Sequence, residues 1–400
     1  MPATITLTNV ADAREAYRSP DLRQGLYDAG EVVMADVLVN LHGDEHKRRR
    51  RVENRLFRRD TFDYYENDLF PEVIEATLAP YAQQGRAELV HVGHELMLNL
   101  AALTAGVDRP LGTPEETARL YGYMMFFIEG ATLAHSTLDR AERIAAIGEQ
   151  LAKWDAEFLQ PSINRRRTLL AQLDSGDIDE TDVPRDVLTT LLRNYDVLGL
   201  QPDIVQREVA FMLLAGAHTS ATAWVRSIDA ILGWIATHPE DAERIRADRQ
   251  FVQRCVHETV RLNPSSPTGI RRALAPVTLK SGVRIDEGDM VVIDLVAVNT
   301  DPALFGSDAA QFNPYRDVPP GMGPFGLSFA SGMHVCIGQD LAVGVVPSAD
   351  EQNRHLAGLV SVAVHWAFDH NVRHDPEAAA QPDKTTRRPY WSSYPVLLDA

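Results

Sequence analysis

One short segment carries the residues best suited to chemistry. It reads FASGMHVCIG over residues 329–338, so that Cys336 lies between two glycine-containing turns, just before an apolar helix start at Leu341 and Ala342. Glycines let backbone N–H groups approach the sulfur closely, and these groups together with a helix N-terminus favour the thiolate over the thiol. A thiolate is a natural ligand for a soft metal centre. The alternative interpretation is a buried, inert cysteine in a glycine-rich turn.

The spacing of this segment resembles the haem-binding signature of the cytochrome P-450 haem-thiolate proteins. That signature is Phe, two residues, Gly, one residue, a basic residue, one residue, Cys, one residue and Gly, and it matches from Phe329 to Gly338. The resemblance implies that Cys336 is the axial ligand of the iron of haem b and that His334 contacts a haem propionate. It also implies the family's fold, which is mainly α with small β-sheets: a triangular prism with haem between a long central helix and the cysteine loop.

Two further basic segments match the family's propionate-binding positions. His46 and Arg50 fit its His-x-x-x-Arg helix and lie one turn apart, so both can face one haem edge. Arg271 aligns with another propionate-binding arginine, and Arg272 is the close competitor. The run from Lys47 to Arg51 would otherwise be a solvated helix face or a nucleic-acid patch. We expect its other basic residues to point outward on the thiolate side of the haem, where an acidic electron carrier such as a ferredoxin can dock.

An ion-paired triad is the third match. Glu258 and Arg261 are three residues apart on a predicted helix, and they resemble the family's Glu-x-x-Arg motif. Arg316, in the segment from Phe312 to Arg316, resembles the arginine that completes the triad. The implied role is structural, because a buried and fully paired charge network fixes the core beside the haem.

The middle of a long predicted helix, LLAGAHTS over residues 213–220, resembles the oxygen-activation groove. Ala215 and Gly216 would border the haem, and Thr219 with His218 would serve catalysis. Alone, this fragment indicates a packing seam of small residues. The family usually has an acidic residue before the threonine, whereas this chain has His218, which sterol demethylases of the superfamily also carry. His218 either relays protons or hydrogen-bonds to backbone.

Substrate contacts are expected from the segments that cover the haem in this family. Each side chain alone indicates plain core more than a ligand contact, but together they predict an apolar pocket for a small organic substrate. The candidates are Val33, Met34, Val37, Phe126, Phe127, Ile128, Leu213, Leu214, Ala217, Thr268, Ile270 and Trp391.

Composition excludes several other classes. The 400 residues are 45% apolar and 24% charged, and the formal net charge of −17 makes general binding of nucleic acid or anionic membrane unfavourable. With two cysteines, a disulfide scaffold or a four-cysteine zinc site is excluded. We find neither a secretory signal nor a spanning apolar stretch. The chain is therefore expected to be a cytoplasmic single domain over residues 1–400 without a membrane anchor.

The elements that must position these residues are mostly helices. Thr113-Pro114 begins one helix, residues 138–172 form a second helical region, and Pro202 opens a third that runs to about residue 238. Short strands are expected between residues 270 and 300. The segment 9–17 resembles the family's first B-region helix, so we expect a shorter N-terminus than usual. Pro347 should stop or kink the helix after the cysteine.

Three hypotheses about function follow from the resemblance. The leading one is a monooxygenase that transfers one oxygen atom from O2 and receives electrons from a ferredoxin-type partner with its reductase. The second is a peroxide-driven or atypical haem-thiolate oxidase, which His218 motivates. The third is a haem-binding module without turnover, and the presence of Thr219 argues against it.

Overall fold

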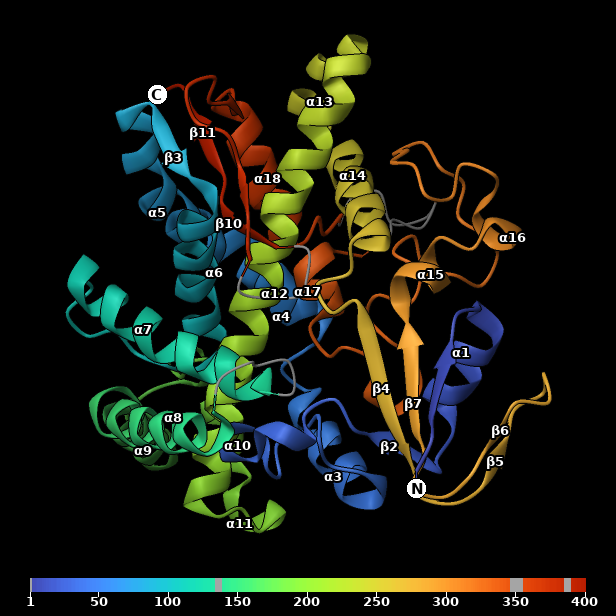
Figure 1. Cartoon of the computed structure of the whole chain (residues 1–400). Helices are drawn as coiled ribbons and strands as arrows, with labels where there is room; N and C mark the ends of the chain where they lie inside the picture. The colour runs from blue at the N-terminus through green and yellow to red at the C-terminus, as the bar shows by residue number, and fades with distance from the viewer. Residues whose placement is uncertain (1, 134–138, 346–354, 385–389) are drawn as a thin grey trace. The chain divides into compact units, whose positions relative to one another are not determined.

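The computed structural model describes residues 2–133, 139–345, 355–384 and 390–400, and in this part of the chain helices dominate over short strands (Figure 1). It divides into two compact units. The first comprises residues 1–25, 62–93 and 219–400, and the second comprises residues 26–61 and 94–218. The expectation of one domain over the whole chain stays a prediction.

The helices account for most of the described chain. The α-helices are α1 (Val10–Arg18), α2 (Glu31–Met34), α3 (Gly43–Glu53), α4 (Arg59–Tyr64), α5 (Phe70–Gln84), α6 (Leu89–Ala105), α7 (Pro114–Ala131), α8 (Arg140–Trp154), α9 (Gln160–Ser175), α10 (Val187–Arg193), α11 (Tyr195–Leu198), α12 (Pro202–Thr237), α13 (Ala242–Ala247), α14 (Arg249–Leu262), α15 (Leu295–Asn299), α16 (Pro302–Phe305), α17 (Gln339–Val343) and α18 (Leu359–Asp369). Short 3-10 or π turns are η1 (Asp28–Gly30), η2 (Tyr65–Leu69), η4 (Asp155–Leu159), η5 (Glu180–Asp182), η6 (Pro239–Asp241) and η7 (Gly332–His334).

The strands belong to the first unit. They are β1 (Thr4–Leu7), β2 (Leu22–Gln24), β3 (Arg86–Glu88), β4 (Thr268–Ala273), β5 (Val277–Thr278), β6 (Arg284–Ile285), β7 (Met290–Asp294), β8 (Arg373–His374), β9 (Gln381–Pro382), β10 (Trp391–Ser393) and β11 (Pro395–Leu397). They form a four-stranded sheet in the order β1-β7-β4-β2, a three-stranded sheet β3-β11-β8, and the pairs β10-β9 and β5-β6.

The four-stranded sheet forms where buried residues alternate with partly exposed ones. In β4 and β7 every second residue is buried, which is the period of a strand with one covered face. β1 pairs parallel with β7, whereas β7–β4 and β4–β2 are antiparallel. Val291 and Ile293 of β7 pack against Ala13, Ala16 and Tyr17 of α1 in one hydrophobic cluster. This sheet therefore holds Arg271 of β4 in a fixed position.

The helix boundaries follow the predicted capping residues. Thr113 caps α7 by accepting a hydrogen bond from the Glu116 amide, and Pro114 occupies its first turn. α12 runs over 36 residues, about 54 Å, as predicted from Pro202 onward. The predicted helical region 138–172 begins one residue outside the described chain at Leu138. It consists of α8 and α9 joined by the π turn η4, which accommodates Pro161.

The chain after the cysteine departs from one continuous helix, as predicted, but it does so before Pro347. α17 ends at Val343, because Gly344 adopts a φ of +77°. Pro347 lies outside the described residues, and a helix resumes at α18. There, the Glu66 carboxylate accepts hydrogen bonds of 2.9 Å from the amides of Ala357 and Gly358. In the described chain, no helix combines the length and apolar character needed to cross a bilayer.

Candidate active site

The cysteine loop of the first unit presents a thiol at its tip. The Cys336 amide donates to the Phe329 carbonyl over 2.9 Å, and the Val335 amide donates to the Gly332 carbonyl over 3.2 Å. Gly332 has a φ of +72°, and a Cβ there would lie 2.7 Å from the Tyr17 carbonyl oxygen, so only glycine fits. Cys336 is exposed. The loop geometry thus holds an accessible sulfur, followed by Gly338 and then α17.

The other cysteine lies in a different environment. Cys255 of α14 is wholly buried, and burial raises the pKa of its thiol far above the ordinary value. Such a thiol stays protonated and does not act as a ligand or nucleophile. The structure therefore separates the two cysteines into one inert and one accessible side chain.

Asn299 fixes the approach to the cysteine loop. Its Nδ2 donates to the Arg261 carbonyl (3.0 Å) and to Ser328 Oγ (2.8 Å), and its Oδ1 accepts from the Leu327 amide (2.8 Å). Gly326 packs so tightly that a Cβ there would lie 2.3 Å from this oxygen. The anchoring role of Asn299 becomes visible only in these contacts.

The structure brings Glu258, Arg261 and Arg316 together. Arg261, fully buried, donates from Nε and Nη2 to both Glu258 carboxylate oxygens over 2.7 Å. Arg316 Nε donates to Glu258 Oε1 over 3.0 Å, and its Nη1 pairs with Asp308 over 2.9 Å. No motif in the sequence marks Asp308, because its pairing depends on the path of the loop after α16. One carboxylate thus holds two guanidiniums in place.

The two arginines of β4 lie on opposite faces of the strand. Arg271 is buried with its guanidinium 4.7 Å from the Tyr17 ring centre, and its Nη1 donates to Gln24 Oε1 over 2.7 Å. Arg272 is half-buried and donates to the Gly288 carbonyl over 3.3 Å. A buried guanidinium suits a cofactor carboxylate, so the geometry favours Arg271. Strand alternation also separates Arg271 from Thr268 and Ile270.

In the second unit, α3 carries His46 and Arg50. His46 is buried, and burial lowers its pKa to about 4, with further lowering by the charge of Arg50. The imidazole is therefore neutral at physiological pH and can donate one hydrogen bond to a propionate oxygen. Arg50 is half-buried, and its Nε donates to Asn54 Oδ1 over 2.9 Å. It is the cationic member of this pair.

The expectation that the other basic residues of α3 point outward is wrong for Arg49. Lys47, Arg48 and Arg51 are exposed, whereas Arg49 is buried, donates to the Asp36 carbonyl and pairs with Glu208 of α12 at 3.4 Å. The helical period explains the difference, because the run covers more than one turn and part of it must face the core.

Arg49 faces two buried carboxyl groups, Glu53 and Glu208. Burial raises the pKa of Glu208 to about 7, in spite of the Arg49 charge and a hydrogen bond from the Leu38 amide. Burial and the charge of Glu208 raise the pKa of Glu53 well above 4.5. Within the described chain, neither Glu53 carboxyl oxygen has a hydrogen-bond partner. One guanidinium thus faces two carboxyl groups, so at least one of these carboxyl groups holds a proton near neutral pH.

We expect this pair to make folding stability fall as pH rises. Between the ordinary glutamate pKa near 4.5 and the raised pKa of Glu208 at about 7, the folded chain retains protons that the unfolded chain releases. Each retained proton lowers the free energy of unfolding by about 1.4 kcal/mol per pH unit. Glu53→Gln should flatten this slope and be more stable than the wild type at pH 8. Urea unfolding at several pH values measures how the free energy of unfolding depends on pH. Glu45→Gln is the control, because Glu45 is exposed. An unchanged slope in Glu53→Gln would contradict the assignment.

The middle of α12 is open although it lies deep in a long helix. Gly216 and Thr219 are exposed, and Ala215 and His218 are partly exposed. The Thr219 carbonyl accepts a hydrogen bond of 2.9 Å from Ser265 Oγ. His218 Nδ1 lies 3.2 Å from His94 Nε2 of α6. His218 therefore has a side-chain partner, His94, which neither of the two alternatives for His218 had named.

The predicted substrate contacts divide by burial. Phe126, Thr268, Ile270 and Trp391 retain partial exposure and stay candidates. The others are closely packed, so in this structure they contact protein and do not line an open cavity. The residues with 0% exposure are Val33, Met34, Val37, Phe127, Leu213 and Ala217, and Ile128 and Leu214 are 8% exposed. Val33, for example, would lie 2.9 Å from a Cβ placed on Gly130. The sequence does not distinguish the partly exposed candidates from the closely packed ones, because most residues of both sets are apolar.

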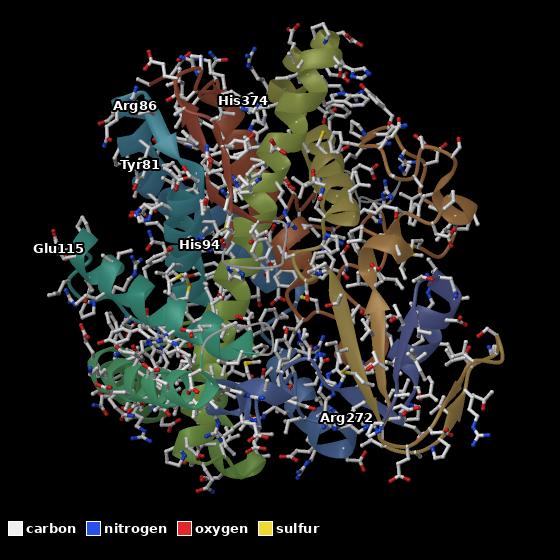
Figure 2. The ribbon with its side chains drawn as sticks, viewed as in Figure 1. Tyr81, Arg86, His94, Glu115, Arg272 and His374 are labelled. Carbon is white, nitrogen blue, oxygen red and sulfur yellow. The ribbon has the colours of Figure 1, made fainter. Side chains whose placement is uncertain are left out.

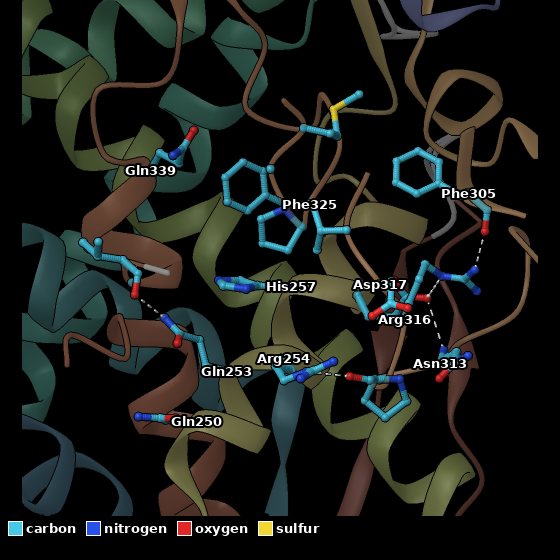
Figure 3. A pocket seen from close by; sticks show the side chains of 18 of the residues that line it. Gln250, Gln253, Arg254, His257, Phe305, Asn313, Arg316, Asp317, Phe325 and Gln339 are labelled. Carbon is cyan, nitrogen blue, oxygen red and sulfur yellow. Dashed lines mark hydrogen bonds and ion pairs between the residues drawn. The ribbon is translucent and has the colours of Figure 1, made fainter. Parts of the chain in front are cut away.

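A cleft of about 720 Å³ lies in the first unit beside α14 (Figure 3). His257, Arg254 and Arg316 line it together with Phe325 and the segment after the cysteine loop, including Gln339. Arg254 Nε donates a hydrogen bond to the Pro314 carbonyl, and Figure 3 shows the hydrogen bond from Arg316 to the Phe305 carbonyl. The predicted substrate contacts are not among its lining residues, so this cleft is separate from the proposed substrate position.

Histidines elsewhere have other partners than a metal. In the described chain, no group of three or more His, Cys, Asp or Glu side chains is arranged to hold a metal ion. His370 stacks on Trp366 with ring centres 3.7 Å apart, and His374 lies 6.0 Å from Tyr394. Both histidines therefore contact aromatic side chains.

The residues fit a haem by their chemistry. In the first unit, an accessible thiol stands in a loop with backbone amides, and Arg271 and His334 are buried polar groups. In the second unit, α3 supplies a neutral imidazole at His46 and the cation Arg50. A soft thiolate ligand with separate cationic groups for two carboxylates is the donor set that iron protoporphyrin requires.

Comparison with known proteins agrees with this chemistry. The family model described as Cytochrome P450 matches residues 147–343. Pulcherriminic acid synthase of Bacillus subtilis (strain 168) is 26% identical over 341 residues, which are 83% of this chain and 77% of that protein. Cyclomarin C epoxidase CymV of Salinispora arenicola (strain CNS-205) is 26% identical over 251 residues, 61% of this chain and 60% of that protein.

Solved structures share the fold. CalO2 has a TM-score of 0.73 at 19% identity, and the likeness covers 98% of this chain and 90% of that one. The P450 enzyme CYP109B1 from Bacillus subtilis also has a TM-score of 0.73, at 16% identity, over 98% of this chain and 93% of that one. Fold and site together define a haem-dependent oxidoreductase. The chain belongs to the cytochrome P450 family, and its activity is that of a monooxygenase.

Proposed function

We propose that Cys336 is the axial thiolate ligand of haem b and that the enzyme inserts one oxygen atom of O2 into a C–H or double bond of a small apolar substrate. The observation that carries this proposal is the accessible Cys336 thiol in a loop that Gly332 and Asn299 fix. A carbon monoxide difference spectrum of the reduced protein tests the ligand. A screen for substrate-induced spectral shifts then narrows the substrate, and a spectrum without thiolate character contradicts the proposal.

The residues around the cofactor have separate roles in holding it and in positioning the substrate. When bound, the haem supplies the oxygen chemistry, and a thiolate ligand favours O–O cleavage. Arg271, Arg50, His46 and His334 hold its two carboxylates through charge and hydrogen bonds. Phe329 packs edge-on against Phe325, with ring centres 4.9 Å apart, and stiffens the loop. Ala215 and Gly216 would border the haem, and neither carries a large side chain that would obstruct it. Phe126, Thr268, Ile270 and Trp391 position the substrate.

Thr219 supports proton delivery to the oxygen site. We expect Thr219→Ala to uncouple electron use from product, since its hydroxyl is the exposed polar group in the middle of α12. Product per electron should fall about tenfold while hydrogen peroxide rises. Ser220→Ala, one residue along, is the matched control because that side chain is buried. Tightly coupled turnover in Thr219→Ala would remove its proposed role.

Electrons are proposed to come from a ferredoxin with its reductase, in the cytoplasm. The exposed cations Lys47, Arg48 and Arg51 of α3 support docking of an acidic carrier, because complementary charge accelerates association. The imidazole of His218 in place of a carboxyl group favours peroxide-driven chemistry as a second candidate. Comparing product formed with peroxide alone and with ferredoxin plus reductase decides between the two electron sources.

A further inference from the structure

Two histidines from different helices form a pair beside the oxygen-activation segment. Figure 2 shows His94 on α6. Its Nε2 lies 3.2 Å from His218 Nδ1, and the two rings are inclined by only 14° with centres 5.5 Å apart. The separation of the centres exceeds the nitrogen–nitrogen distance by about two ring radii. The rings are therefore nearly coplanar and meet edge to edge, which is the geometry of a linear N–H···N hydrogen bond.

Close packing of α6 and α12 fixes this pair. In the second unit, a Cβ on Gly216 would lie 3.2 Å from Ala101 Cβ, and in the first unit, a Cβ on Gly93 would lie 2.8 Å from the Trp224 ring. Gly93 is adjacent to His94, and Gly216 is two residues from His218. The glycines therefore set the helix separation that the two imidazoles need. The Tyr121 ring of α7, inclined by 67° with its centre 6.0 Å from the His94 ring centre, limits ring rotation.

We propose that His94 is a positioning residue and that it and His218 form a two-imidazole proton relay to the oxygen site; this rests on the proposed haem function. His94 donates its Nε2–H to His218 Nδ1, which places the proton of neutral His218 on its Nε2. A proton taken up at His94 Nδ1 displaces the Nε2 proton to His218 Nδ1, and His218 gives up its Nε2 proton. One proton enters and one leaves, and exchange with water at both partly exposed rings restores the tautomers.

Three variants distinguish a proton-relay role of His94 from a purely structural role. His94→Gln retains an N–H donor for His218 but cannot pass a proton, whereas His94→Phe retains only the ring shape. His91→Gln is the matched control, because His91 is an exposed histidine one turn earlier on α6. The first measurement is the single-turnover rate after the reduced holoprotein meets O2, in H2O and in D2O. We expect His94→Gln to slow the single-turnover rate on the order of tenfold. The loss of a general acid usually slows a reaction more than this, but here water reaches both rings and can replace part of the relay.

A second readout does not depend on turnover. In ¹⁵N-histidine-labelled holoprotein in its reduced, carbon-monoxide form, His218 should show one tautomer with the proton on Nε2. His94→Phe should move the His218 Nδ1 resonance and mix the tautomers, whereas His94→Gln and His91→Gln should leave one tautomer. Unchanged His218 resonances in His94→Phe, or a wild-type turnover rate in His94→Gln, would overturn the relay. A wild-type protein without a thiolate-type carbon monoxide spectrum would instead refute the haem function.

Discussion

Cys336→Ser is expected to abolish the thiolate-type carbon monoxide spectrum and all oxygen insertion. A serine hydroxyl does not ionise near neutral pH and is a poor ligand for iron, whereas a cysteine thiolate is a good one. The fold should survive, because the side chain is exposed and its amide keeps the 2.9 Å hydrogen bond to Phe329. The difference spectrum of the reduced protein and the product yield both measure the effect.

The second cysteine supplies the matched control for this experiment. Cys255→Ala removes a buried thiol of α14 and should retain the spectrum, although a small cavity lowers the free energy of unfolding. If Cys336→Ser kept the wild-type spectrum, or if Cys255→Ala lost it, the assignment of the ligand would be wrong. Far-ultraviolet circular dichroism of both variants shows whether the fold is intact.

Glu258→Gln is expected to lower the free energy of unfolding by about 3–5 kcal/mol and to weaken haem retention. The side chain keeps its shape, but the charge that pairs with buried Arg261 and Arg316 is lost. Two guanidiniums would then face a neutral amide, whose N–H groups also repel one of them. Urea unfolding measures the stability, and the ratio of haem to protein absorbance measures retention.

Arg254→Gln is the control for the triad. Arg254 lies on the same helix, α14, but is exposed and donates to the Pro314 carbonyl over 2.9 Å. Loss of that one hydrogen bond should change the free energy of unfolding by about 1 kcal/mol or less. A loss of less than about 1 kcal/mol in Glu258→Gln would show that the triad does not support the core in the proposed way.

Local signals in the sequence predicted much of the helical architecture. Thr113-Pro114 predicted the start of α7, and Pro202 with the pattern after it predicted α12. The turns at Gly282 and Gly288 bound short strands, and both glycines have positive φ. The break after α17 was predicted from Pro347 but occurs earlier, at Gly344, whose left-handed backbone ends the helix. These features depend on residues close in sequence, which is why spacing alone indicates them.

The candidate site could be predicted only to the level of residue type. The motif from Phe329 to Gly338 singled out Cys336, and Glu258 with Arg261 lie on one helical face because three residues separate them. The faces of β4 were not predicted. Arg271 was assigned to the haem and Thr268 with Ile270 to the substrate, and the strand places these two sets on opposite faces. Apolar candidates such as Val33 and Phe127 are fully buried in this structure, and hydrophobicity alone does not distinguish a residue that lines a cavity from one in the packed core.

By itself, the sequence determined the ligand loop, the charged helix motifs and the order of the elements, because each follows from neighbours a few residues apart. The tertiary structure alone decided which groups meet over long separations. His94 and His218 are 124 residues apart in the sequence. Arg49 of α3 pairs with Glu208 of α12. Such contacts depend on how glycines and buried side chains set the distance between helices, and that distance exists only once the chain has folded.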